Sequence, residues 1–210
     1  MSLIQYIIPN SKSDEICESL TKLLRDEFAN QLLLSPTNYI YNAEIENDRF
    51  TPFSNPYNED GTLIKSDSIN TKIVVHFTGF DVLQTNPEYQ RVKGKFAIRI
   101  NHRLIENEIS EGSEISQRDV KKLALIVRYI LQSKEHYYLI PSGINGIHAK
   151  KVTGIQIESV FRTDSTINET SAQVDFEAEY NEVATDLTTY PVSGVDAITN
   201  NDIKITVPKI

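Results

Sequence analysis

The segment that most constrains the fold of this chain lies at residues 171–180, where apolar and polar residues alternate without a break. A period of two places every apolar side chain on one face of a β-strand. The apolar positions are Ala172, Val174, Phe176, Ala178 and Tyr180, and the polar positions are Gln173, Asp175, Glu177 and Glu179. The pattern predicts a strand of an antiparallel sheet, with one face against a core and an exposed face that is almost purely anionic.

Three further segments carry strand patterns. Residues 69–77 and 92–101 also alternate, and we expect these two segments to be antiparallel neighbours. Residues 78–91 contain a glycine and an Asn-Pro pair, so they are expected to form an extended connection. Residues 151–161 precede a polar turn and then the strand at 171–180, an order that predicts a hairpin.

Two segments have the apolar spacing of amphipathic helices. The first spans residues 13–34, with Ser13 as its N-cap, and it ends before Pro36 because a proline disfavours helical geometry at the preceding residue. The second is expected to begin at Ser116, since Ser116 and Asp119 resemble a capping box. Apolar residues of the two stripes are Ile16, Leu20, Leu23, Leu24 and Phe28 in the first helix, and Val120, Leu123, Ala124, Val127, Ile130 and Leu131 in the second.

Together these segments predict an α+β fold, in which an antiparallel sheet has two helices packed on one face. A chain of 210 residues suits one domain with arms. We place the domain at residues 1–180, with a long loop at 37–68, and a C-terminal arm at 181–210. The arm ends in an alternating segment, 203–207, for which two arrangements are open. It adds a strand to the sheet edge of another subunit, or it folds back on its own domain or stays mobile.

Charge is distributed unevenly along the chain. The formal net charge is -8 and the pI is near 5.1, which argues against a general grip on a nucleic-acid backbone. Residues 1–90 carry 6 basic and 13 acidic side chains, residues 91–151 carry 12 and 6, and residues 152–210 carry 3 and 10. The net charges of these three parts are therefore -7, +6 and -7. Such asymmetry indicates either complementary surfaces of neighbouring subunits or segments that pair within one monomer.

If the complementary surfaces belong to neighbouring subunits, candidate residues for the subunit contact can be chosen from the sequence. Lys121, Lys122 and Arg128 lie off the apolar stripe of the second helix. We predict that these cations of one subunit meet the anionic side of the strand at 171–180 in the next subunit. The acidic candidates are Asp175, Glu177 and Glu179.

Residue types that support catalysis are sparse and scattered. The four histidines, His76, His102, His136 and His148, stand far apart and belong to no metal-binding motif. The single cysteine, Cys17, lies beside the first apolar stripe and is expected to be a small buried core residue. We therefore predict a protein that is not an enzyme, with no catalytic residues, no cofactor and no metal.

The sequence also predicts where the protein is made. The first residues lack the basic flank and cleavage site of a secretory signal, and no apolar run is long enough to span a membrane. We expect synthesis in the cytoplasm and no membrane partner.

The order of elements resembles a known family. Helix, long loop, two antiparallel strands and a capped helix are followed by strands at Gly154–Glu158 and Gln173–Glu177. This order is similar to that of the tail-terminator and head-to-tail joining proteins of tailed bacteriophages. The closest local likeness is Val160–Asp164, which leads through a polar hairpin to Ala172–Phe176. The resemblance covers roughly residues 13–180, and the long first loop and the C-terminal arm depart from the family.

The resemblance implies a small domain with two helices on one face of an antiparallel sheet, copies of which form a ring. It implies a structural virion protein made in the host cytoplasm, whose partners are itself and other phage neck, portal or tail proteins. It provides no catalytic residues. No sequence-specific nucleic-acid contact is expected, although the lumen of such a ring could pass DNA. Two alternatives remain open: a non-enzymatic adaptor or binding module with an acidic docking face, and a metal-independent hydrolase.

Overall fold

A computed structural model describes most of the chain. The described residues are 2–6, 12–49, 51–53, 59, 70–85, 89–105, 111–133, 147–158, 161–164, 167–183, 188–191, 198–200 and 203–205. The helices are α1 (Lys12–Leu34), the 3-10 turn η1 (Tyr39–Tyr41) and α2 (Glu111–Gln132). The strands are β1 (Ser2–Tyr6), β2 (Ala43–Asn47), β3 (Thr71–Thr85), β4 (Tyr89–Ile105), β5 (Ile147–Ile157), β6 (Phe161–Asp164), β7 (Ile167–Val183), β8 (Thr188–Pro191), β9 (Ile198–Asn200) and β10 (Ile203–Ile205).

The chain divides into two compact units. One is the domain Ser11–Glu182, and the other combines Met1–Asn10 with Val183–Ile210. In the second unit β1 pairs antiparallel with β8, and β9 pairs antiparallel with β10. The division expected from the sequence put the first ten residues with the domain, whereas pairing of β1 with β8 groups them with the arm. The tip of the arm is likewise paired, since Ile203–Ile205 lies against Ile198–Asn200.

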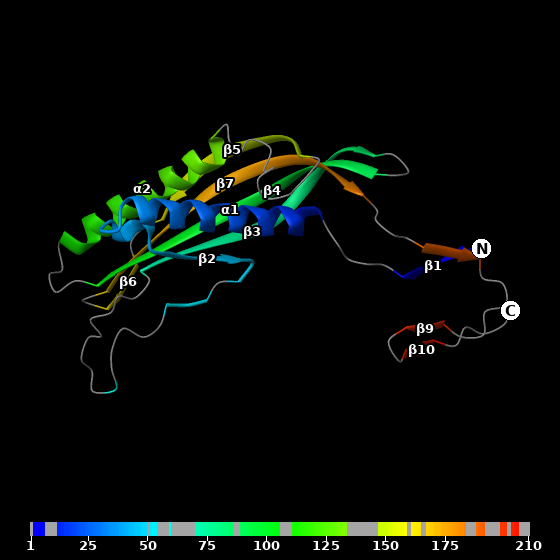
Figure 1. Cartoon of the computed structure of the whole chain (residues 1–210), viewed down its shortest axis with the longest axis horizontal. Helices are drawn as coiled ribbons and strands as arrows, with labels where there is room; N and C mark the ends of the chain where they lie inside the picture. Colours follow the sequence, from blue (N-terminus) through cyan, green and yellow to red (C-terminus); the bar gives the residue numbers. More distant parts are fainter. Residues whose placement is uncertain are drawn as a thin grey trace. The chain divides into compact units, whose positions relative to one another are not determined.

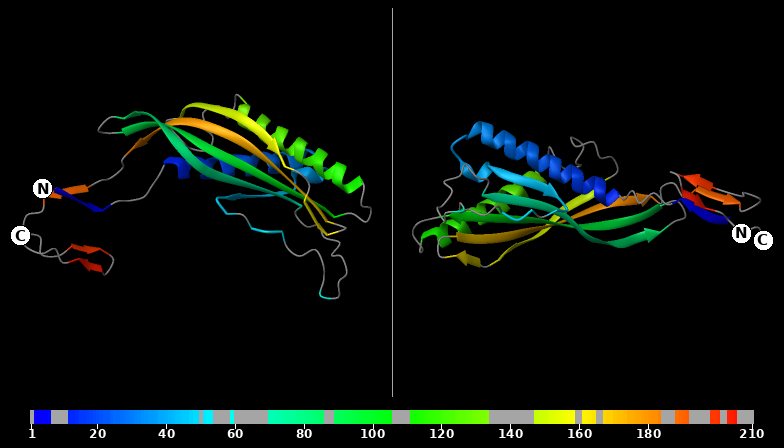
Figure 2. Two further views of the ribbon diagram at one scale, coloured as in Figure 1. Left: turned by 180° about the vertical axis from the view of Figure 1, so that it is seen from behind. Right: turned by 90° about the horizontal axis from the view of Figure 1, so that it is seen from below.

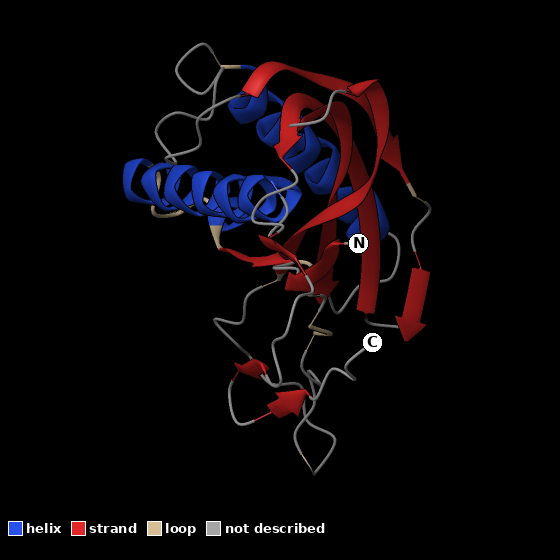
Figure 3. Cartoon of the chain, turned by 90° about the vertical axis from the view of Figure 1, so that its right-hand side faces the viewer, coloured by secondary structure: helices blue, strands red, loops and turns tan. Residues whose placement is uncertain are grey.

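The domain is built on one sheet with the strand order β2-β3-β4-β7-β5, and β6 pairs with β7 outside that path. β3 pairs antiparallel with β4, and β5 pairs antiparallel with β7. Both helices lie on one side of the sheet (Figures 1 and 3). The expected α+β fold, with two helices packed on one face of a mostly antiparallel sheet, is confirmed.

The segment at 37–68, expected to be a long loop, contains η1 and β2. β2 runs parallel to β3, with Ala43 opposite Thr71 and Asn47 opposite Val75, so the sheet is not purely antiparallel. The strand was missed because Ile45 is its only buried residue. A single buried side chain produces no alternation that a sequence can show.

The expected connection at 78–91 is largely strand. β3 continues to Thr85 and β4 begins at Tyr89, so the two strands extend together as a ribbon (Figure 2). Most of the described residues of this part of β3 are exposed. Because no core selects their residue types, the sequence shows no clear strand pattern here. The register shifts beside Gly79, whose φ of +139° is unusual for any residue with a side chain.

The second helix begins earlier than its sequence predicts. α2 starts at Glu111, five residues before Ser116, and the Ser116 hydroxyl is hydrogen-bonded to Thr170 Oγ1 at 2.8 Å instead of capping a helix. Ser116 is fully buried, so its hydroxyl ties α2 to β7. The capping-box prediction was therefore wrong. The first helix begins at Lys12, within one residue of its expected start, but Ser13 lies inside the helix and is not its N-cap as expected.

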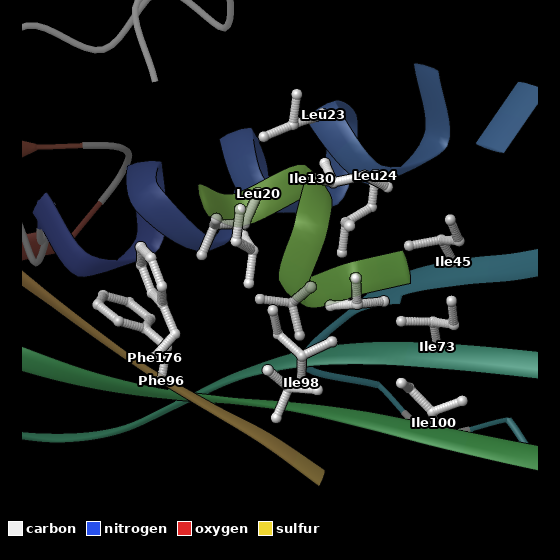
Figure 4. Packing of buried hydrophobic residues seen from close by; sticks show 14 of the residues in the cluster. Leu20, Leu23, Leu24, Ile45, Ile73, Phe96, Ile98, Ile100, Ile130 and Phe176 are labelled. Atoms are coloured by element: carbon white, nitrogen blue, oxygen red, sulfur yellow. The ribbon is translucent and has the colours of Figure 1, made fainter. Parts of the chain in front are cut away.

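The core lies between the helices and the sheet. All five apolar residues of the alternating segment in β7 are at most 2% exposed, which confirms the predicted buried face. Cys17 is fully buried, as expected. Figure 4 shows side chains of α1 and α2 above those of β2, β3, β4 and β7. The labelled residues are Leu20, Leu23, Leu24, Ile45, Ile73, Phe96, Ile98, Ile100, Ile130 and Phe176.

Candidate functional site

The predicted acidic residues lie on the face of the sheet away from the helices. Their neighbours at even-numbered positions of β7 belong to the core beneath the helices, so the odd-numbered side chains point to the opposite face. Glu179 accepts a 2.9 Å contact from Arg91 of β4, and Glu177 lies 4.0 Å from Lys93. Both carboxylates are only 28% exposed. The two predicted anions therefore already have cationic partners within their own chain.

The other flank of the acidic row is also occupied. Lys151 of β5 stands directly opposite Glu177 in the register. Asp175 is different, because the hydrogen bonds it accepts come from two neutral amides, Gln156 Nε2 at 3.3 Å and Gln173 Nε2 at 2.7 Å. The strand order thus puts cations on both sides of the acidic strand. Of the two explanations offered for the charge asymmetry, this arrangement corresponds to pairing within one monomer.

A hollow of about 430 Å³ opens on this part of the sheet. Burial lowers the pKa of Lys150 to about 8. Because the lining mixes both charge signs, the hollow favours neither a strongly anionic nor a strongly cationic ligand. Its lining residues are Lys93, Lys150, Lys151, Glu177 and Glu179.

The three predicted basic residues lie on the outer face of α2. Lys121, Lys122 and Arg128 are all exposed. Lys122 Nζ is 3.8 Å from Asp119 Oδ1, while Arg128 donates to Gln132 Oε1 at 3.0 Å, a neutral acceptor. Since α2 covers the face of the sheet opposite to the acidic row, one chain cannot bring these cations to those acids. A contact between the two sets requires two copies, and it stays a prediction.

Apolar side chains stand between these cations. Leu125 is 51% exposed and Tyr129 is 80% exposed, and their spacing of four puts them side by side on α2. They border a groove of about 350 Å³ between α1 and α2. The groove is lined by Glu27, Gln31, Tyr41, Leu125, Ile126, Tyr129, Ile130 and Ser133. Sequence reasoning missed this surface, although two large apolar residues among charged ones on an outer helix face are a readable signal.

A buried polar cluster joins α2 to the sheet. His102 Nε2 lies 4.0 Å from Asp119 Oδ2, and His102 Nδ1 is hydrogen-bonded to Thr71 Oγ1 at 2.9 Å. Tyr39 donates its hydroxyl to Asp119 Oδ2 at 2.5 Å. Burial lowers the pKa of His102, and the nearby Asp119 carboxylate only partly opposes this effect. Because His102 and Asp119 are each 1% exposed, the pair is enclosed by protein and has the features of a structural contact.

On the face of the sheet that the helices leave uncovered, called here the uncovered face, residues 51–53 pack over two cations. The Phe53 ring lies 5.6 Å from Lys72 Nζ and 4.6 Å from the Arg103 guanidinium carbon. Lys72 also contacts Glu44 of β2 at 2.8 Å. Cation–π contacts of this kind stabilise partly desolvated cations. They hold residues 51–53 against β3 and β4, so these residues lie over a part of the sheet face that the helices leave uncovered.

The histidines are placed on different sides of the domain. His76 lies 3.7 Å from Asp48 on the uncovered face of the sheet, whereas His102 is in the interior. His136 and the side chain of His148 lie outside the described residues. Within the described part of the chain, no three His, Cys, Asp or Glu side chains are grouped as metal ligands.

None of the described helices is long and apolar enough to cross a membrane. No protein-family model matches the sequence, and no curated protein is significantly similar to it.

Proposed function

We propose that this protein is a structural virion protein that forms a homo-oligomeric ring at the head-to-tail junction or the tail terminus of a tailed bacteriophage. The proposal draws on the resemblance in element order over residues 13–180. That resemblance implies two helices on one face of an antiparallel sheet, and the domain has two helices on one face of a mostly antiparallel sheet. The ring serves assembly and passage of DNA, so it needs neither a catalytic residue nor recognition of a nucleotide sequence.

The observation that carries the proposal is the unlike character of two opposite surfaces of the domain. The outer face of α2 presents Leu125 and Tyr129 among cations, while the uncovered sheet face carries side chains of both charges. In a ring, each subunit contacts its two neighbours through different surfaces. Two outer faces of α2 packed on each other would instead bring like charges together at Lys121, Lys122 and Arg128, which disfavours a two-fold dimer through this helix.

The first test is the mass of the full chain in solution. Size-exclusion chromatography with light scattering is expected to give a multiple of 23.9 kDa, and electron micrographs are expected to show closed rings. A chain that stays monomeric at every protein concentration would contradict the ring and favour the alternative, an adaptor with an acidic docking face. That alternative is weakened by the in-chain cations beside Glu177 and Glu179.

A matched pair of variants tests whether the α2 surface takes part. Leu125→Glu places a charge at the centre of the proposed contact and is expected to shift the ring towards monomers. Val82→Glu is the control, because Val82 is 50% exposed against 51% for Leu125 but lies on the β3 ribbon. Neither change removes a buried side chain, so both variants are expected to keep the unfolding midpoint of the wild type. Equal assembly of both variants would exclude this face of α2 from the ring contact.

A further inference from the structure

The surfaces of the domain differ in how many of their charged side chains and strand edges already have a partner, or are blocked from pairing, within the chain. β5 is one edge of the sheet, and it carries Lys150, Lys151 and register shifts at two places. Lysines and bulges on an edge strand oppose pairing with a strand of another chain. β2, the opposite edge, is only five residues long. Neither edge therefore offers a long and regular template for a partner strand.

The uncovered sheet face is a second candidate, and its charges are largely matched. Arg91 and Lys93 contact Glu179 and Glu177, and Lys95 contacts Asp81 at 2.8 Å. A partner of either charge would have to displace one of these contacts. The matched charges leave this face without a strong preference for an anionic or a cationic partner.

The outer face of α2 carries cations without a carboxylate partner among the described residues, although Lys122 lies 3.8 Å from Asp119 Oδ1. Lys121 makes no ion pair with any residue that the structure describes, and Arg128 is bonded to the amide of Gln132. These cations surround the exposed Leu125 and Tyr129. A fitting partner has apolar residues for the centre and carboxylates for the rim.

The chain contains a segment with that composition. Residues 183–202 include three acidic residues and no lysine or arginine, so their net charge is -3. Apolar residues stand between the acidic ones along the segment. The acids are Asp186, Asp196 and Asp202, and the larger apolar residues are Val183, Leu187, Tyr190, Val192, Val195 and Ile198. The segment belongs to the second compact unit, which is held together by its own strand pairs.

We infer that the outer face of α2 binds residues 183–202, the acidic part of the C-terminal arm, of a neighbouring copy. The inference rests on the proposed ring and names the partner of its α2 surface. It replaces the acidic row of β7 as the partner of Lys121, Lys122 and Arg128, because Glu177 and Glu179 already contact cations of their own chain. Leu125 and Tyr129 are the apolar anchors, and the cations set the register of the arm along the helix.

Crosslinking between two distinguishable copies tests the contact. One copy, enlarged by a tag, carries Tyr129→Cys, and the untagged copy carries Val195→Cys. A short bismaleimide is expected to give a product with the summed mass of the two copies. Wild-type chains provide the control for Cys17, which is fully buried and is expected to stay unlinked. The same reaction with Val82→Cys in place of Tyr129→Cys is the matched negative control.

A charge exchange then tests the partner assignment. Lys121→Glu is expected to weaken association about fivefold, the effect of an exposed ion pair at the upper end of its range. Asp196→Lys in the same chains is expected to restore association, since each contact again pairs opposite charges. Lys22→Glu, an exposed lysine of α1, is the control that Asp196→Lys should not rescue. Rescue of Lys121→Glu by Glu177→Lys instead would overturn the arm as the partner and assign β7.

The outcomes separate the arm contact from the ring itself. Rings without a crosslink between position 129 and position 195 would overturn the arm contact and leave the ring standing. A further experiment uses a chain that carries both Tyr129→Cys and Val195→Cys, diluted into an excess of wild type. A crosslink that forms only within one such chain would also overturn the arm contact. Monomers in light scattering would overturn both. A crosslink between copies together with rescue by Asp196→Lys is the result that supports the inference.

Discussion

His102 of β4 and Asp119 of α2 face each other inside the domain, with 4.0 Å between Nε2 and Oδ2 and each residue only 1% exposed. Thr71 bonds to the other ring nitrogen of His102, and Tyr39 donates to the carboxylate. Four elements, η1, β3, β4 and α2, therefore meet at one polar cluster. The cluster holds α2 and η1 in a defined position on the sheet, because Asp119 would lose its contact with His102 if α2 shifted and with Tyr39 if η1 shifted.

The first prediction concerns stability against pH. Burial lowers the pKa of His102 below its ordinary value of 6.5, so the unfolded chain binds a proton more readily than the folded chain. The free energy of unfolding is therefore expected to fall as the pH drops through 6.5, with a slope of at most about 1.4 kcal/mol per pH unit from this residue. Urea unfolding at about pH 7.5 and about pH 5.5 measures the change.

Comparison with His102→Gln isolates the contribution of this histidine. The variant has no titrating ring, so its stability is expected to depend less on pH in this range. Other groups near the pair remain the same, including Asp119, with Arg118 at 3.9 Å and Lys122 at 3.8 Å from Oδ1. An equal pH dependence in wild type and variant would show that His102 does not change its protonation on unfolding.

A second prediction concerns the tyrosine hydroxyl of the cluster. Tyr39→Phe removes the donor to Asp119 Oδ2, and Asp119 Oδ1 already has no hydrogen-bond partner among the described residues. Leaving a buried carboxylate short of a donor is expected to lower the free energy of unfolding by about 1–3 kcal/mol. Tyr129→Phe is the control, since Tyr129 is 80% exposed, and it is expected to change stability by less than about 0.5 kcal/mol. Chemical denaturation of the three proteins distinguishes the cases, and equal losses in both variants would contradict a role of the Tyr39 hydroxyl.

The third prediction concerns the close approach of β4 to Tyr180. A Cβ atom added at Gly94 would lie 2.6 Å from Tyr180 Cε1 and 2.8 Å from its hydroxyl oxygen. Tyr180 is fully buried, so its ring cannot move into solvent, and Gly94→Ala is expected to destabilise the fold by about 1–3 kcal/mol. Gly154→Ala is the matched change on β5, where the nearest atom is Asp175 Oδ2 at 3.3 Å on a half-buried side chain. Thermal unfolding should therefore show a much smaller loss for Gly154→Ala, and the reverse order would refute the packing argument.

The fourth prediction concerns the reactivity of the single cysteine. Burial raises the pKa of the Cys17 thiol to about 12, with smaller contributions from Asp48, Asp14 and Glu18. Both the shortage of thiolate and the lack of exposure are expected to prevent alkylation of the folded protein near neutral pH. Mass spectrometry after iodoacetamide treatment should find Cys17 unmodified in buffer and modified in denaturant. Rapid modification in buffer would mean that α1 opens readily from the core.

Elements with a long periodic pattern were predictable. The alternating segment in β7 and the apolar stripe of α1 each repeat over several turns or residue pairs, so the sequence itself records which side is buried. The stripe of α2 predicted a helix in the same way. Its start at Glu111 was not predicted, because Ser116 and Asp119 resemble a cap but are used for contacts with Thr170 and His102. A local motif does not reveal that a distant residue competes for the same side chain.

Elements whose partners lie far away in the chain were not predictable. β2 has a single buried residue, Ile45, and exists as a strand because it pairs in parallel with β3. The His102 and Asp119 pair was missed for the same reason, since seventeen positions and a change from strand to helix separate its members. Pairing between remote segments depends on the strand order and the docking of the helices, and neither is encoded at a fixed spacing.

The order of residue types was enough to predict the α+β class, the buried faces of α1, α2 and β7, and the net charges of -7, +6 and -7 along the chain. It also identified Lys121, Lys122 and Arg128 as one basic group. Which charges remain available to a partner depends on how the strands and helices are arranged in space. By placing β4 and β5 on either side of β7, the sheet brings cations to Glu177 and Glu179 within the chain. The outer face of α2 points away from the sheet, and its cations, Leu125 and Tyr129 are exposed there. Charges interact according to their distance in space, and the strand order sets that distance.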